Sequence, residues 1–153
     1  MACNIQINVQ EQDFTLDQLA NAASSRPGQA GALVVFTGMV RDFNEDSNLK
    51  GLFLEHYPGM TEKSLHKIAE EAASRWDLLG VSVVHRIGEL LNAENIVGVA
   101  VRSQHRKNAF QACEFIMDYL KTEAPFWKKE ITESGADWVK AKKSDDDERE
   151  RWR

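Results

Sequence analysis

The segment from about Arg106 to Lys121 is predicted to be a helix with apolar residues around more than one side, and it constrains the fold most. Pro125 ends it. One apolar stripe consists of Phe110, Cys113, Met117 and Leu120, and Ala112, Phe115, Ile116 and Tyr119 extend it around the cylinder. Such a helix must be covered on more than one side. The cover is either a sheet with a neighbouring helix of the same chain, or a second copy in an isologous homodimer.

The rest of the chain alternates between strand and helix patterns. Thr15 begins a short helix to about Ser24, with Leu16 and Leu19 facing inward, and Thr61 begins a longer one. Strand patterns, which alternate or are rich in β-branched and aromatic residues, occupy residues 3–9, 31–41, 51–57, 81–87, 96–103 and 126–133, with a short one near 138–139. This order indicates an α+β fold with a mixed or antiparallel sheet and about three helices.

Length and charge limit the possible functions. The chain has 153 residues, 42% of them hydrophobic, enough for one domain over residues 1–153 with a buried core. From about residue 141 onward we expect a charged, flexible tail. The net charge of −5 argues against bulk electrostatic binding of nucleic acid, so an anion site must be a local basic patch.

The sequence predicts neither a membrane protein nor an exported one. No apolar run approaches the roughly 18–20 residues that cross a bilayer, and residues 1–4 do not begin a signal peptide. Cys3 and Cys113 have neither metal-site nor disulfide spacing. A cytoplasmic location is therefore expected.

Familiar catalytic and cofactor motifs are absent, among them Gly-rich phosphate loops, Cys-x-x-Cys, His-Glu-x-x-His and Gly-x-Ser-x-Gly. The histidines are far apart in the sequence, so no metal and no other cofactor is predicted. His66 lies on the polar side of its helix. His56 and His85 have apolar neighbours in strands, which favours hydrogen-bonded structural histidines.

Cationic residues lie at both ends of the helix between Arg106 and Lys121. At its start, His105 and Arg106 join free backbone N–H groups that favour anions. A phosphate clamp and a solvated helix start are equally good interpretations there. Because about 22 Å separates Arg106 from Lys121 along a helix, a small ligand contacts both only in an elongated site or one built from two subunits.

Two lysines follow the helix directly after the aromatic pair Phe126-Trp127. In a strand, Lys128 and Lys129 point to opposite faces, so only one of them shares a pocket with Lys121. A lysine near other cations loses its proton more readily and can serve as an acid or a base. Arg41, which ends the strongest predicted strand beside a polar loop, is a further candidate for binding.

Five sequence blocks together resemble the family of large, catalytic subunits of molybdopterin synthase, the MoaE family. They are FTGMVR (36–41), LEHYPGMTEKSL (54–65), VVHRIGEL (83–90), SQHRKNAF (103–110) and MDYLKTEAPFWKKE (117–130). The resemblance implies an α/β-hammerhead-type fold and a sulfurtransferase of molybdenum cofactor biosynthesis. A small ubiquitin-like carrier subunit would deliver sulfur as a C-terminal thiocarboxylate to cyclic pyranopterin monophosphate, forming the dithiolene of molybdopterin. The large subunits would form a homodimer at the centre of a heterotetramer.

The resemblance also implies site residues. By matching motif, Lys121 and Lys128 would be the catalytic lysines. The implied substrate-binding residues are Met39, Val40, Arg41, His105, Arg106, Lys129, Glu130 and Lys142. In this family His105 and Arg106 come from the neighbouring subunit. The chain departs from the pattern at Met39, where relatives often carry lysine, so a contact there would come from the backbone or be lost.

Imported sulfur agrees with the two cysteines, because a protein that used its own thiol would need an exposed, activated one. Cys113 lies in the apolar stripe and Cys3 in an edge-like strand. Two other functions stay open. One is a non-catalytic module that binds a phosphate ligand on the same fold. The other is a single-stranded nucleic-acid binder that uses the Phe126-Trp127 pair and the lysines, which the net charge disfavours.

Overall fold

The computed structural model of the chain describes residues 3–41, 49–132, 135–139 and 143–152. Within them, strands and helices alternate much as expected. Their order is β1 (Asn4–Gln10), α1 (Leu16–Ala22), β2 (Ala32–Met39), β3 (Leu49–His56), α2 (Met60–Arg75), β4 (Leu78–Arg86), β5 (Gly88–Leu91), β6 (Asn95–Ser103), α3 (Arg106–Glu123), β7 (Phe126–Thr132), β8 (Gly135–Val139) and α4 (Lys143–Glu150).

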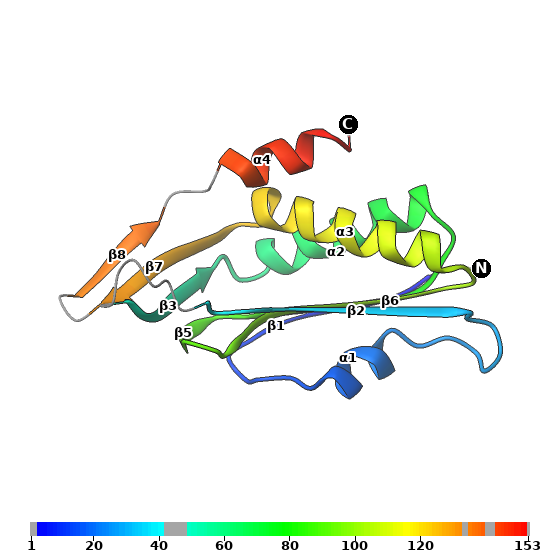
Figure 1. The fold of residues 1–153 in the computed structure, drawn as a ribbon, viewed down its shortest axis with the longest axis horizontal. Helices are drawn as coiled ribbons and strands as arrows, with labels where there is room; N and C mark the ends of the chain where they lie inside the picture. Colours follow the sequence, from blue (N-terminus) through cyan, green and yellow to red (C-terminus); the bar gives the residue numbers. More distant parts are fainter. Residues whose placement is uncertain (1–2, 42–48, 133–134, 140–142, 153) are drawn as a thin grey trace.

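Four strands form a first sheet, sheet A, in the order β1-β4-β6-β2. β1 pairs with β4 in parallel, and the other two pairs are antiparallel. Helix α1 packs on one face of this sheet, and α2 and α3 pack on the other (Figure 1). Covering both faces explains why β4 and β6 are hydrophobic runs that do not alternate with polar residues.

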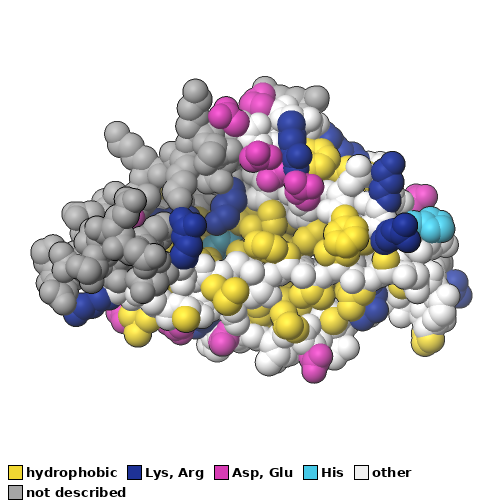
Figure 2. Space-filling view, in the orientation of Figure 1, with side chains coloured by type: hydrophobic (Ala, Val, Ile, Leu, Met, Phe, Trp, Pro, Cys, Tyr) yellow, Lys and Arg dark blue, Asp and Glu magenta, His cyan; other side chains and the backbone are white. Residues whose placement is uncertain are grey.

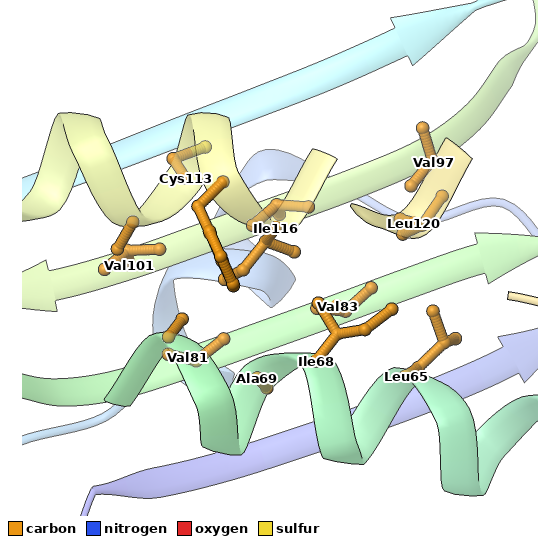
Figure 3. Close-up of a cluster of buried hydrophobic side chains, with 14 of the residues drawn as sticks. Leu65, Ile68, Ala69, Val81, Val83, Val97, Val101, Cys113, Ile116 and Leu120 are labelled. Carbon is orange, nitrogen blue, oxygen red and sulfur yellow. The ribbon is translucent and has the colours of Figure 1, made fainter. Parts of the chain in front are cut away.

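The larger core lies between sheet A, α2 and α3. Figure 3 shows Leu65 and Ile68 of α2 and Ile116 of α3 directed toward the same layer of buried side chains. On α3, Phe115 is fully buried, whereas Phe110 is 61% exposed. The cover within the chain, which the sequence left open as one of two alternatives, is therefore present, and the face of α3 at Phe110 remains uncovered.

The smaller core lies under α1. A capping box begins this helix: the Thr15 hydroxyl accepts from the Gln18 N–H (3.1 Å), and the Gln18 side chain accepts from the Thr15 N–H (2.8 Å). Leu19 is fully buried. A Cβ atom at Gly98 would lie 2.4 Å from Leu19 Cδ1, so only glycine lets α1 approach the sheet this closely. The inward orientation predicted for Leu16 is wrong, since this first helical residue is 59% exposed.

The other four strands form sheet B, in the order β5-β3-β7-β8, with antiparallel pairs throughout. It lies beyond one end of sheet A (Figure 1). One mixed and one antiparallel sheet with packed helices confirm the predicted α+β class. Strand β5 was not predicted: it has only four residues and begins at Gly88, whose φ of 84° is typical of a turn.

Helix α4 packs on α3 in the segment for which a charged tail was expected, which adds a fourth helix to the three predicted. Trp152 anchors this end of the chain. Its ring centroid lies 5.8 Å from that of Trp76 and 5.7 Å from that of Phe115. Its carbonyl accepts a hydrogen bond from Arg75 (2.7 Å). No helix in the described ranges is long and apolar enough to cross a membrane.

The contrast within α1 is testable with one substitution at two positions. Leu19→Ala removes a fully buried side chain and should lower the free energy of unfolding by about 2–5 kcal/mol. Leu16→Ala, on the exposed side of the same helix, should change it by less than about 1 kcal/mol. Urea denaturation followed by circular dichroism measures both. Equal losses would show that the two leucines are equally buried, contrary to this packing.

Candidate functional site

The C-terminal end of α3 leads directly into β7. Lys121 is an exposed residue in the last turn of the helix. Ala124 has extended backbone angles, and Pro125 prevents further helix. The fully buried Thr61 holds this turn, because its hydroxyl donates to the Pro125 carbonyl (2.9 Å) and accepts from the Tyr57 N–H (3.0 Å). The direction in which the chain leaves Lys121 is thus fixed by a buried contact.

The lysines of β7 lie on opposite faces of sheet B, as strand alternation requires. Lys128 pairs with Leu54, whose side chain is buried, and Glu130 lies on the same face two residues later. Lys129 is on the other face, with its Nζ atom 3.9 Å from Glu55 Oε1. Lys128 is therefore on the side of the strand that faces the protein interior.

His85, at the end of β4, lies close to both Lys121 and Lys128. Its side chain is buried, and its ring stacks on Phe126 with the ring centroids 3.8 Å apart. Burial, together with the smaller effect of the positive charges of Lys121, Lys128 and His56, lowers the pKa of His85 to about 3. The imidazole is therefore neutral near pH 7. The structure thus brings the two lysines predicted to be catalytic together around one buried histidine.

Neither His85 nor His56 was predicted to belong to a site; both were expected to be structural histidines. His56 lies at the end of β3, with its Nε2 atom 4.0 Å from Glu62 Oε1. Both histidines have apolar neighbours in the sequence, and no local pattern marks them. Only the pairing of distant strands brings them to the lysines. Figure 2 shows a recessed histidine (cyan) close to dark-blue side chains, which are Lys or Arg, on this face of the molecule.

The end of β2 carries three of the predicted binding residues. Val40 is buried, its N–H donates to the Glu94 carbonyl (2.8 Å), and its own carbonyl accepts from the Ala93 N–H (2.8 Å). Met39 and Arg41 on either side are exposed. Two backbone bonds therefore hold Val40 and present its two neighbours at the surface.

The ends of β2 and β4 lie in the same row of sheet A, because Gly38 and His85 both pair with Val97. Arg41 consequently belongs to the same end of the sheet as the lysine pair. His105 and Arg106 do not. They are exposed at the start of α3, the opposite end of that helix from Lys121 (Figure 1).

One predicted residue, Lys142, lies outside the described residues. In the part of the chain that the structure describes, no group of His, Cys, Asp and Glu could hold a metal ion. Burial raises the pKa of the Cys113 thiol to about 12 and also raises that of Cys3. Neither thiol is then a ready nucleophile near pH 7. The site therefore offers fixed positive charge next to a buried, neutral surface. Such an arrangement stabilises negative charge that develops during a reaction.

Comparison with known proteins agrees over most of the chain. Residues 9–123 match the family model described as MoaE protein. The molybdopterin synthase catalytic subunit of Vibrio cholerae is 53% identical over 146 residues, which is 95% of this chain and 97% of the relative. The solved structure of molybdopterin cofactor biosynthesis protein E from Burkholderia multivorans superposes with a TM-score of 0.82 and 49% identity, covering 97% of this chain and 96% of that one. Molybdopterin synthase from Staphylococcus aureus gives a TM-score of 0.78 and 35% identity, over 90% and 96% of the two chains. The chain belongs to the MoaE protein family.

Proposed function

We propose that this chain is a sulfurtransferase, the catalytic subunit that builds the dithiolene of molybdopterin. The sulfur donor is the C-terminal thiocarboxylate of a small ubiquitin-like carrier, and the acceptor is cyclic pyranopterin monophosphate. The relative in Vibrio cholerae, which is 53% identical, is named molybdopterin synthase catalytic subunit. The observation that carries the proposal is the convergence of Lys121 and Lys128 on the buried, neutral His85.

The chemistry of a thiocarboxylate donor fits this arrangement. Releasing sulfur from an acyl group requires attack on the acyl carbon, and negative charge develops on its oxygen. Fixed cations beside a poorly hydrated surface stabilise such charge more than they would in water. Lys121 and Lys128 are the cations that act here, and either can also move a proton. Because the thiols of Cys3 and Cys113 have raised pKa values, sulfur from a partner is favoured over sulfur from the chain itself.

The remaining binding residues divide between this end of the chain and a second subunit. Met39, Val40 and Arg41 would hold the substrate from the end of β2, together with Glu130 and Lys142. Lys129 was also expected to bind the substrate, but it lies with Glu55 on the opposite face of β7 and would not contact it. His105 and Arg106 start a helix whose other end carries Lys121, about 22 Å away along the axis. In our proposal they serve the site of the neighbouring subunit and bind the substrate phosphate there.

An isologous homodimer supplies that second subunit. Two large apolar side chains near the uncovered face of α3 are exposed, Phe36 (39%) and Phe110 (61%). A groove of about 340 Å³ lies between β2 and α3, with Phe36, Phe110 and Met117 in its wall. β2 is also an edge strand of sheet A, and such an edge is a site for pairing with another chain.

We further propose a cytoplasmic location, where free cysteines such as Cys3 and Cys113 are usual.

Loss of the Lys121 ammonium should remove the transition-state stabilisation that the proposal requires. Lys121→Ala is expected to lower dithiolene formation by about a hundredfold or more while the melting temperature stays unchanged, since this side chain is exposed. Lys67→Ala, an exposed lysine on α2, serves as the matched control and should keep full activity. The assay combines the thiocarboxylated carrier, the cyclic pterin and each variant.

Full activity in Lys121→Ala would contradict the assignment. If the wild-type chain binds the pterin phosphate but forms no dithiolene with the thiocarboxylated carrier present, the chain is instead a phosphate-ligand-binding module.

The composite site can be tested by mixing two inactive variants. If Arg106 serves the neighbouring subunit, a mixed dimer of Lys121→Ala and Arg106→Ala chains contains one site with both wild-type residues. After denaturation and joint refolding at equal concentrations, activity should return to about a quarter of wild type, the share of intact sites at random pairing. Each variant refolded alone should stay inactive. No recovery in the mixture would show that both residues act within one chain.

A further inference from the structure

His85 is held rigidly on two sides of its ring. Its Nδ1 atom lies 2.9 Å from the Arg86 carbonyl. Because a carbonyl can only accept, Nδ1 carries the proton, and Nε2 is left with a lone pair. The Arg86 side chain is fixed in turn, since its guanidinium donates to the carbonyls of Glu11 (2.9 and 3.0 Å) and Asn95 (3.0 Å). The imidazole therefore has a defined tautomer and a defined plane.

The face of that ring determines the position of Phe126. The two rings are stacked, with an angle of 19° between their planes and 3.8 Å between their centroids. Phe126 is the first residue of β7 and pairs in register with His56. It stands in the short connection between Lys121 and Lys128. A movement of Phe126 would therefore change where Lys128 lies relative to the end of α3.

The protonation state of His85 suits a residue beneath two cations. Burial and the charges of Lys121, Lys128 and His56 keep its pKa near 3, against the opposing effect of the hydrogen bond to the Arg86 carbonyl. The ring thus stays neutral as pH changes through the physiological range, and it adds no charge that would repel the lysines. His56 and His66, by contrast, each lie beside a carboxylate: His56 Nε2 is 4.0 Å from Glu62 Oε1, and His66 Nδ1 is 2.8 Å from Glu70 Oε1.

We propose that His85 is a positioning residue for the sulfur-transfer site: locked by Arg86 and stacked on Phe126, it sets the placement of Lys128 relative to Lys121. The role rests on the proposed function of the two lysines. This positioning role differs from that of an ordinary core residue, because a side chain that only filled volume could be replaced by any apolar group of similar size. A stacking surface can be replaced only by another flat ring.

Two substitutions of His85 separate these roles. His85→Phe keeps a ring that can stack on Phe126, and His85→Leu keeps apolar volume without a stacking face. We expect His85→Leu to lower kcat about a hundredfold, the cost of displacing a reacting group by about 1 Å, with little change in KM. His85→Phe should stay within about fivefold of wild type because it keeps the stack. His66→Leu, at an exposed histidine, is the control and should match wild type.

A second measurement follows the lysines directly. Reductive methylation with ¹³C-formaldehyde gives each lysine its own NMR signal, assigned through Lys121→Arg and Lys128→Arg chains. The signals of Lys121 and Lys128 should move in His85→Leu and stay near their wild-type positions in His85→Phe and His66→Leu. If His85→Leu does not fold, as judged by circular dichroism, Phe126→Leu removes the same stack from its half-buried side and should give the same losses.

The outcomes separate the two proposals. Equal kcat values and unmoved lysine signals in His85→Leu and His85→Phe overturn the positioning role and leave the sulfur-transfer function intact. If wild type itself makes no dithiolene, the proposed function fails. The lysine signals then decide the positioning role alone: a shift in His85→Leu, absent in His85→Phe, supports it, and no shift overturns it.

Discussion

Phe115, Ile116 and Leu120 of α3 are buried against sheet A and α2, and this packing fixes where the helix ends. Because α3 runs along the sheet, its last turn reaches the end of sheet A at which β2 and β4 also end (Figure 1). The chain then enters β7 without a long loop, so Lys128 follows Lys121 closely in space as well as in sequence. The hydrophobic packing of α3, which is far larger than the site, therefore fixes the positions of the two lysines.

A cationic site on an acidic protein has an electrostatic cost that this structure limits. The chain carries a net charge of −5, which repels an anionic substrate overall, so binding depends on the local positive charge of the two lysines near His85. Their mutual repulsion is not increased by His85, whose low pKa keeps it neutral. Lys129 is directed away toward Glu55 on the opposite face of the strand. The positive charges of Lys121 and Lys128 thus remain on the side proposed for the anionic substrate, while the charge of Lys129 is paired with Glu55 on the other side.

Much of the fold could be predicted, because hydrophobic periodicity determined it locally. The helix that begins after Thr15, the strands around β6 and the helix from Arg106 were expected and are present. The cationic residues and the family resemblance, not periodicity, pointed to the lysines. Neither pointed to His85, because its stacking partner Phe126 is distant in the sequence. The prediction for Leu16 was wrong for the opposite reason: it fits the periodic pattern, yet as the first residue of α1 it is 59% exposed. β5 and α4 were missed because each is short and acquires its structure from its neighbours.

The close approach of α1 to sheet A has a consequence for how sequences of this kind can diverge. A Cβ atom at Gly98 would lie 2.4 Å from Leu19 Cδ1 and 2.6 Å from the Phe14 ring. A larger residue at position 98 therefore requires a smaller one at position 14 or 19, or a helix that stands farther from the sheet. Drift at these positions must be correlated, and a relative that has lost this glycine should carry its compensating change at position 14 or 19.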